Sequence, residues 1–281
     1  MELTQKNYFS RTNTAISNSK VKDFLVGKEY YYHKHIKRDL DESPSEALVV
    51  GSILDKIAQQ GTLTHFRRLY QVSVKKSENA ERFAKQKSKS DKYILTRRQY
   101  DMIEGMATKM LASPWYKWYG EKTKKQVPLM ANLDMIYDKG GLDDLRVYNR
   151  IKICGLLDFL TIDGDTAYID DLKTAPNDAL YSTTSWFQQC KRFDYFRQMA
   201  VYRHLVWANY KDIKQVVCRH AVIGKENYHP TKLFIIPESM MAGPIEEFVE
   251  VAKQIATTTD WTEQLPDWSR AETLDEELIN L

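Results

Sequence analysis

Residues 153–174 have the sequence ICGLLDFLTIDGDTAYIDDLKT, in which two largely apolar segments, 153–162 and 166–174, flank Asp163-Gly164-Asp165. Both segments are rich in β-branched, aromatic and aliphatic residues, which is typical of β-strands. The joint contains both Asp-Gly and Gly-Asp, and either pair can form a two-residue hairpin turn. The sequence therefore predicts a β-hairpin here.

Three charged side chains share one face of this hairpin: Asp158, Asp171 and Lys173. That holds for either two-residue turn and fails for a three-residue loop, because side chains alternate between the faces of a strand. Two carboxylates and an ammonium on an otherwise apolar ribbon would repel or stay unpaired unless a ligand used them, and a hard divalent cation suits oxygen donors. Asp170 is expected to point the other way. The hairpin is therefore predicted to hold a metal site.

The whole chain has the composition of a folded soluble protein, with 281 residues of which 43% are hydrophobic and 28% charged. We expect a single domain over 1–281, with a mainly helical, basic part (1–125), a catalytic sheet core (126–258) and an acidic tail (259–281). No apolar run approaches the roughly 20 residues that span a bilayer. The first residues do not resemble a secretion signal. We expect no membrane partner and a cytoplasmic protein.

The three cysteines, Cys154, Cys190 and Cys218, are too few and too dispersed for a disulfide framework, a structural zinc or a four-cysteine iron–sulfur cluster. Each is expected to be a small residue of the core.

Charges are unevenly distributed, since residues 1–125 contain 25 Lys and Arg against 14 Asp and Glu, and residues 126–281 contain 16 against 24. The two parts therefore have net charges of +11 and −8, which sum to the +3 of the chain. A basic region suits a polyanion, and an acidic one suits metal ligation. A distribution that only keeps the protein soluble explains the asymmetry equally well.

The apolar spacing predicts helices over residues 17–39, 45–60 and 96–111, and the polar, lysine-rich residues 72–92 are expected to be exposed. The sheet is expected to begin near Gln126.

After the hairpin we expect a helix, two strands and a helix: 195–210, 215–223, 232–236 and 238–257. Residues 260–281 contain seven acids and one base, and Trp261 and Trp268 suggest that part of this tail packs on the body. The order of elements predicts an α/β fold with a mixed central β-sheet flanked by helices.

Asp158 followed by Asp171-Leu172-Lys173 resembles the core of the PD-(D/E)xK nucleases, and further segments resemble the RecB-like branch in the same order. Residues 17–25 and 30–34 are similar to its opening helix. Residues 47–55 resemble its Gly-x-x-x-His motif, and Gln198-Met199-Ala200-Val201-Tyr202 matches its Q-x-x-x-Y motif. The combination is similar to phage-type recombination exonucleases such as the RecE nuclease domain and, more distantly, lambda exonuclease.

Two positions depart from the family pattern: Asp55 stands where many members have His, and Gly27-Lys28 stand where cluster-containing members have Cys-Pro. Asp is still an oxygen ligand for Mg²⁺, so the first change adjusts the site. The second agrees with the cysteine count in speaking against an iron–sulfur cluster.

The resemblance implies a restriction-endonuclease-like core with an N-terminal helical elaboration, and hydrolysis of DNA with Mg²⁺, for which Mn²⁺ substitutes. The implied metal ligands are Asp55, Asp158, Asp171 and the backbone carbonyl of Leu172. Lys173 would hold or help deprotonate the attacking water. Burial or the metal would lower its pKa, although the carboxylates push it upward. The number of ions is left open.

Gln198 and Tyr202 lie four residues apart on one predicted helical face and would orient the scissile strand or Lys173. Without the family match they would be ordinary helix-surface residues. Aromatic and basic residues in two places are candidates for DNA contact: Tyr31, Tyr32, Lys34, Lys191, Arg192 and Arg197, with Arg203. The aromatic residues among them could equally belong to the core, and each basic residue alone could be a solvated charge.

Asp-x-Lys alone is a weak signal, because Asp212-Ile213-Lys214 has the same pattern without a preceding acidic strand. For Asp158 and Asp171 the alternative is a pair of exposed hairpin charges bound to lysines. A metal enzyme that does not act on nucleic acid would want histidine ligands, but the six histidines show no paired helical spacing near the acids.

The family resemblance implies an exonuclease that resects duplex DNA ends for recombination with a single-strand annealing partner. A homo-oligomeric ring in the cytoplasm of a bacterial host would fit this class. An endonuclease on the same core is one alternative, distinguished by its cutting closed circular DNA. A catalytically degenerate DNA-binding module is another, which the departure at Asp55 keeps open.

Overall fold

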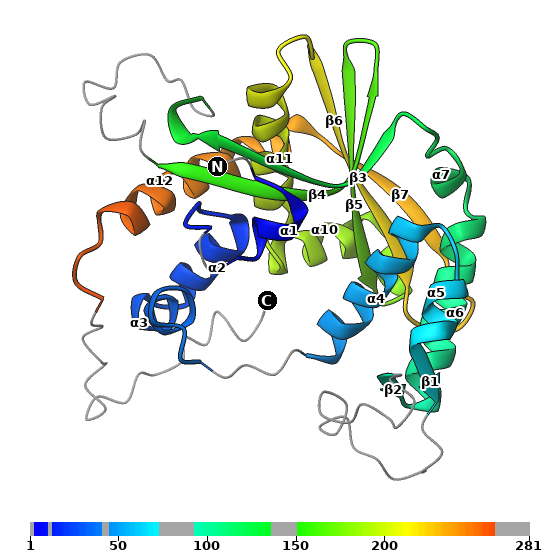
Figure 1. Cartoon of the computed structure of the whole chain (residues 1–281). Coiled ribbons are helices and arrows are strands. Elements are labelled where there is room, and N and C mark those ends of the chain that lie inside the picture. The colour runs from blue at the N-terminus through cyan, green and yellow to red at the C-terminus, as the bar shows by residue number, and fades with distance from the viewer. Residues whose placement is uncertain (1–2, 11–12, 41–44, 73–92, 136–150, 262–281) are drawn as a thin grey trace.

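The computed structural model describes residues 3–10, 13–40, 45–72, 93–135 and 151–261. Its main sheet has five strands in the order β3-β4-β5-β6-β7 (Figure 1). β5 and β6 are parallel, and the other neighbouring pairs are antiparallel. The strands are β3 Thr123–Asn132, β4 Lys152–Asp163, β5 Thr166–Ala175, β6 Gln215–Gly224 and β7 Thr231–Ile236. The predicted α/β fold with a mixed sheet is confirmed.

The hairpin of β4 and β5 forms with Gly164-Asp165 as its two-residue turn, because Asp163 pairs with Thr166. Gly164 has a φ of 62°, a left-handed conformation that glycine adopts without strain. The predicted parity is therefore confirmed. Asp170 points away from the predicted site, as expected, and forms a bidentate ion pair with Arg219 at 2.6 and 2.7 Å.

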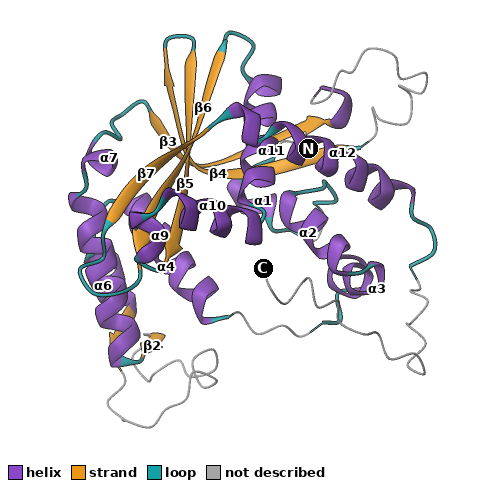
Figure 2. Cartoon of the chain, turned by 180° about the vertical axis from the view of Figure 1, so that it is seen from behind, coloured by secondary structure: helices purple, strands orange, loops and turns teal. Residues whose placement is uncertain are grey.

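Helices lie on both sides of this sheet (Figure 2). One buried apolar cluster joins α2, α11 and α12 to the sheet, and a second joins α4 and α6 to it. The longer helices are α2 Asn18–Val26, α4 Glu46–Gln60, α6 Arg97–Ala112, α10 Thr183–Arg192, α11 Tyr195–Asn209 and α12 Ala242–Thr257. The shorter elements are α1 Gln5–Tyr8, α3 Lys28–Tyr31, the π-helix η1 Tyr32–Lys37, α5 Thr64–Leu69, α7 Pro114–Lys117, α9 Asp178–Tyr181, the 3₁₀ turns η3 Leu133–Met135 and η4 Glu238–Met240, and the strands β1 Tyr70–Val72 and β2 Tyr93–Leu95.

Side-chain caps fix where three of the predicted helices begin. Ser17, Ser45 and Thr96 each accept a hydrogen bond from a backbone N–H in the first turn of α2, α4 and α6. Such caps satisfy N–H groups that have no partner within the helix. These predicted starts are confirmed.

Other predicted bounds were wrong. Residues 17–39 are not one helix, because Gly27 adopts an extended conformation between α2 and α3. β3 begins at Thr123 rather than Gln126, and α12 begins at Ala242, after the 3₁₀ turn that follows Pro237. Helix α10 was not predicted at all.

The prediction that part of the tail packs on the body is confirmed for Trp261, whose ring stacks on Tyr31 at 5.4 Å between centroids. Trp268 and most of the segment 72–92 lie outside the described residues. The three cysteines are buried and free, as expected for core residues. Among the described helices, none combines the length and apolar character needed to cross a membrane.

Candidate active site

Asp158 lies where β4 and β5 separate. Their ladder ends with Phe159 opposite Asp170, one position before Asp158 would face Asp171. Asp158 Oδ2 instead accepts the backbone N–H of Leu172 at 2.8 Å. Burial raises the pKa of Asp158 well above its ordinary value, and repulsion from Asp55 and Asp171 adds to the effect. This carboxylate therefore needs a nearby positive charge to stay ionised.

One hydrogen-bonded chain links Asp171, Lys173, Gln198 and Tyr202. Gln198 Nε2 donates to Asp171 Oδ1 at 3.2 Å and to Tyr202 Oη at 2.9 Å, and Gln198 Oε1 accepts from Lys173 Nζ at 3.0 Å. The Lys173 ammonium also contacts the carboxylate of Asp171. The amide of Gln198 thus fixes both members of the Asp-x-Lys pair.

Gly155 of β4 allows α11 to lie close enough for these contacts. A Cβ on Gly155 would lie 2.8 Å from the ring of Tyr202 and 2.8 Å from Leu205, so any larger residue would push the helix outward. Gln198 and Tyr202 are one turn apart on α11: Gln198 reaches Asp171 of β5, and the Tyr202 ring lies against Gly155 of β4.

Asp55 of α4 approaches the same place from the other side of the sheet. Its pKa is raised to about 7, first by burial and then by repulsion from Asp171, while Lys173 opposes the shift. Among the described residues no hydrogen bond or ion pair is formed by its side chain, so Asp55 is held near Asp171 without a neutralising contact of its own.

The donors fit a hard divalent cation in their chemistry. Asp55, Asp158 and Asp171 offer oxygen atoms only, which suits Mg²⁺ or Mn²⁺. Burial is the main cause of the raised pKa values of Asp55 and Asp158, and repulsion from Asp171 adds to both. In the described ranges, however, no three His, Cys, Asp or Glu side chains lie close enough together to hold a metal ion as they stand. Lys173 is the cation that contacts Asp171 in this arrangement.

The predicted direction of the Lys173 pKa was wrong for the protein without a metal. Burial lowers this pKa, but the charges of Asp171, Tyr195 and Asp158 together raise it more, so the net shift is upward. The ammonium is therefore stabilised as a cation and is poorly suited to accept a proton.

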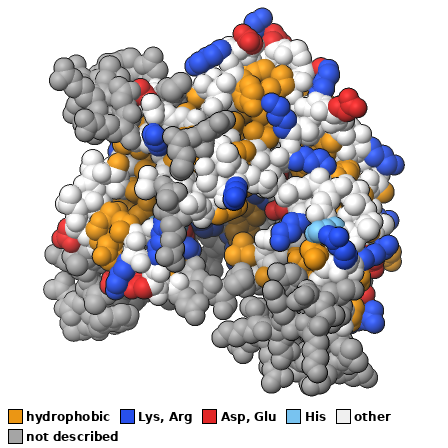
Figure 3. Space-filling view, viewed as in Figure 1, with side chains coloured by type: hydrophobic (Ala, Val, Ile, Leu, Met, Phe, Trp, Pro, Cys, Tyr) orange, Lys and Arg blue, Asp and Glu red, His pale blue; other side chains and the backbone are white. Residues whose placement is uncertain are grey.

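A cavity of about 680 Å³ lies at this site. Asp55, Leu172 and Lys173 line it, together with residues of α4 and of the turn between α10 and α11. The predicted use of the Leu172 carbonyl as a ligand remains a prediction. The face shown in Figure 3 is hollowed near its middle, and lysine and arginine side chains lie around the hollow.

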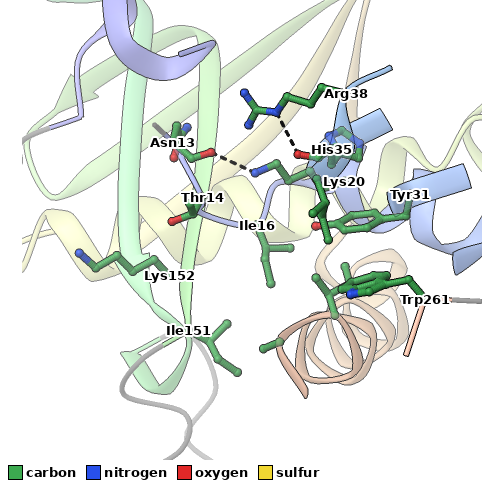
Figure 4. A pocket seen from close by; sticks show the side chains of 13 residues that line it. Asn13, Thr14, Ile16, Lys20, Tyr31, His35, Arg38, Ile151, Lys152 and Trp261 are labelled. Carbon is green, nitrogen blue, oxygen red and sulfur yellow. Dashed lines mark hydrogen bonds between the residues drawn. The ribbon is translucent and has the colours of Figure 1, made fainter. Parts of the chain in front are cut away.

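Tyr31 was predicted to contact DNA, but it belongs to the core. Its side chain is 5% exposed and packs between Phe24 and Trp261. Figure 4 shows it among the residues that line a second cavity. This cavity has a volume of about 840 Å³ and shares no lining residue with the cavity at the candidate site. Tyr32 also lies against Trp261, and Lys34 donates to Asp23 at 3.2 Å. The aromatic run of residues 30–35 therefore stabilises the α2–α3 region.

Arg197 was also wrongly predicted to contact DNA. Its side chain is 2% exposed, and its guanidinium is held by Asn18, Asp194 and Glu247. Arg203, at 7%, is similarly buried and pairs with Glu238 at 2.7 Å. Both fix α11 to its neighbours, and their position inside the helix packing could not be read from their charge.

Lys191 and Arg192 are exposed at the end of α10, and Arg192 lines the 680 Å³ cavity. Both remain predicted DNA contacts.

Sequence reasoning missed Gln126, whose Nε2 donates to Asp158 Oδ1 at 3.1 Å. Gln126 has a φ of 51°, which is uncommon for a residue with a side chain and interrupts the pairing of β3 with β4 opposite Asp158. No pattern in the sequence predicts this backbone conformation of Gln126. Tyr195 was missed as well, and the Lys173 ammonium lies 4.5 Å from the centre of its ring.

Comparisons with known proteins address the fold. Residues 17–271 match a family model described as a PDDEXK-like domain of unknown function (DUF3799). A search of the curated proteins gives no match.

Among solved structures, a protein from Eubacterium rectale called "Putative exonuclease" is 20% identical to this chain, with a TM-score of 0.61 over 91% of this chain and 85% of that one. At that identity the likeness shows the fold alone, and it agrees with a restriction-endonuclease-like core. The structure of SSO0001 is 12% identical, covers 72% of this chain and 85% of its own, and has a TM-score of 0.27, which carries no argument.

Proposed function

The chain belongs to the PDDEXK-like family DUF3799, and from that premise we propose that it is a metal-dependent deoxyribonuclease that removes nucleotides from the ends of duplex DNA. The observation that supports the proposal best is the hydrogen-bonded chain of Asp171, Lys173 and Gln198, with Asp158 held beside it by the backbone N–H of Leu172. These residues come from two strands and a helix and meet beside a cavity.

The roles of the chain's own residues follow from the charge that develops on a phosphate under attack. Asp55, Asp158, Asp171 and the Leu172 carbonyl would hold Mg²⁺ or Mn²⁺, and the bound ion would supply an activated water and Lewis acidity. Lys173 stays protonated and would offset negative charge on the phosphate. Gln198 would keep the ammonium and Asp171 in register, and Tyr202 holds Gln198.

A raised Lys173 pKa favours this electrostatic role over that of a general base. A cation that is already paired with carboxylates accepts no proton near neutral pH.

The finer parts of the proposal rest on the resemblance to RecE-like and lambda-type exonucleases and on the name of the Eubacterium rectale protein. They are digestion from duplex ends, a part in recombination with a single-strand annealing protein, a homo-oligomeric ring and a place in the cytoplasm of a bacterial host. An endonuclease on the same core is the second candidate.

The test is a digestion time course with Mg²⁺ on end-labelled linear duplex beside covalently closed circular DNA, with wild-type protein and the Asp158→Asn variant. We expect loss of the linear duplex alone, and no loss with Asp158→Asn or with EDTA. The order in which label is released from the two ends gives the polarity.

Cutting of the circle would replace the exonuclease proposal by the endonuclease. If the protein digests DNA with neither Mg²⁺ nor Mn²⁺, the nuclease proposal is overturned and a DNA-binding module is favoured.

A further inference from the structure

The turn between α10 and α11 presents two aromatic rings to the catalytic cavity. Phe193 and Tyr195 both line it, and their rings stack at 5.6 Å between centroids with an interplanar angle of 26°. Asp194 between them has a φ of 58°, which brings the two side chains to the same side of the turn. Phe193 is 38% exposed, whereas Trp186 of α10 and Phe196 of α11 are buried.

This aromatic pair is continuous with the catalytic network. Tyr195 lies under the Lys173 ammonium at 4.5 Å, and Lys173 contacts Asp171. A group stacked on the outer ring, Phe193, would therefore lie one ring beyond the residues that are proposed to act on the phosphate.

Positive charge surrounds the exposed ring. Lys22 of α2 and Arg192 of α10 lie 5.8 and 5.3 Å from the centre of the Phe193 ring, and Lys225 after β6 lines the same cavity. Asp55 is the one acid among the side chains that line it in the described structure. Away from the metal ligand, the wall is therefore basic and suits a polyanion.

The wall of the cavity that α4 forms is open and, apart from Asp55 and two serines, apolar. Leu48 of α4 is 64% exposed there, and a Cβ on Gly51 would meet no atom within 4 Å. A volume of about 680 Å³ is that of a pocket for a small ligand, and it is large enough for a nucleotide or two.

We propose that Phe193 and Tyr195 form a stacking platform for an unpaired base next to the scissile phosphate, with Lys22, Arg192 and Lys225 along the backbone of that strand. The inference rests on the proposed nuclease function and specifies its substrate: the strand enters the site single-stranded. Aromatic platforms flanked by cations bind single strands with little sequence preference, because every base has a face to stack.

The experiment measures binding without cleavage. A short single-stranded oligonucleotide with one 2-aminopurine, placed at successive positions, is titrated with metal-free protein in EDTA. Stacking quenches 2-aminopurine fluorescence. We expect quenching at one position or two adjacent ones with wild-type protein, and binding weakened roughly tenfold without quenching at those positions with Phe193→Ala.

Two further variants separate stacking from folding and from general charge. Phe193→Trp should restore both affinity and quenching, and Phe9→Ala, which removes a phenylalanine that is 79% exposed and outside both cavities, should behave as wild type. Arg192→Ala should keep the quenching but lower the salt dependence of binding by about 0.7 in the log–log slope, the value for one phosphate contact of a single strand.

Unchanged affinity and quenching in Phe193→Ala would overturn the proposal, as would failure of the wild-type protein to bind any single strand. Because no cleavage is needed, a protein that binds and quenches but never digests DNA would retain this site while losing the proposed nuclease function. If Phe193→Ala digests DNA as well as the wild-type protein does, the nuclease function stands and the stacking platform is refuted.

Discussion

The chain contains the pattern Asp-x-Lys twice, and the two copies have opposite surroundings. In the first, Asp171 and Lys173 are 3% and 13% exposed, contact one another, and are both bound by Gln198. The second copy lies in the turn before β6, where Asp212 is exposed and Lys214 is 82% exposed. Lys214 pairs with Asp165 of the β4–β5 turn at 3.2 Å.

The difference shows what turns a common tripeptide into a candidate site. Exposed pairs contribute little, because water screens their charges. Beside Asp171, burial first and then repulsion from neighbouring carboxylates raise the free energy of the ionised states of Asp55 and Asp158, so that a cation is needed. Position in the sheet, not the tripeptide, makes the difference.

The largest difference in the rate of DNA digestion is expected between variants of the two aspartates, Asp171 and Asp212. Asp171→Asn should lower the rate of DNA digestion by roughly 10³-fold or more, because metal ligation supplies several kcal/mol of transition-state stabilisation. Asp212→Asn should leave the rate unchanged. Initial rates with Mg²⁺ measure both, and equal rates in the two variants would remove the distinction between the copies.

Metal binding to the carboxylate cluster should be measurable without DNA, as a gain in the free energy of unfolding. At about 100 times its dissociation constant, Mn²⁺ should raise the free energy of unfolding by about 2.7 kcal/mol. The Asp158→Asn variant should show little of this gain at the same concentration. Thermal melts with and without Mn²⁺ test this, and an equal gain in both proteins would place the metal elsewhere.

Gln198 should matter less than the acids, because it positions Lys173 and Asp171 and need not touch the substrate. We expect Gln198→Ala to reduce kcat by about 10- to 100-fold with a smaller change in KM. Gln188→Ala, a change at an exposed position of α10, is the matched control and should have no effect. A change in KM alone would assign Gln198 to substrate binding.

In the metal-free protein, Asp55 should change how stability depends on pH, and the direction of its pKa shift fixes the sign of that change. Folding raises this pKa from 3.8 to about 7, so the folded protein holds the proton more tightly. The stabilising contribution is complete below about pH 4 and is lost as the pH rises through about 7. In EDTA, Asp55→Asn should therefore gain stability relative to wild type as the pH rises from about 4 to about 8.

Chemical denaturation across that range measures this difference. Asp212→Asn, at an exposed position, is the matched control. A difference in stability between Asp55→Asn and wild type that does not vary with pH would show that Asp55 is not buried beside Asp171.

The hairpin was predictable because its apolar segments and its Gly164-Asp165 turn fix the register locally. The break at Gly27 was not, because the apolar spacing of α2 continues across it. α10 was missed because few apolar residues mark its buried face, mainly Trp186 and Cys190. The break at Gly27 and the formation of α10 each depend on packing against segments that are distant in the sequence.

Within the candidate site, the charged residues were predictable from spacing and resemblance. The role of Gln126 was not, because it depends on a backbone conformation, and the buried positions of Tyr31 and Arg197 depend on Trp261 and Glu247, which are distant in sequence. The direction of the Lys173 pKa required the relative weights of burial and of three neighbouring groups.

Burial among Asp158, Asp171 and Gln198 distinguishes Lys173 from Lys214, and we expect it to make Lys173 part of a nuclease site. The most direct test is the single-turnover rate of cleavage of linear duplex DNA by Lys173→Ala beside Lys214→Ala, with Mg²⁺ and with DNA binding measured in parallel. We expect a loss of roughly 10²- to 10⁴-fold for Lys173→Ala and wild-type cleavage for Lys214→Ala. Wild-type cleavage by a folded, DNA-binding Lys173→Ala protein would contradict the account.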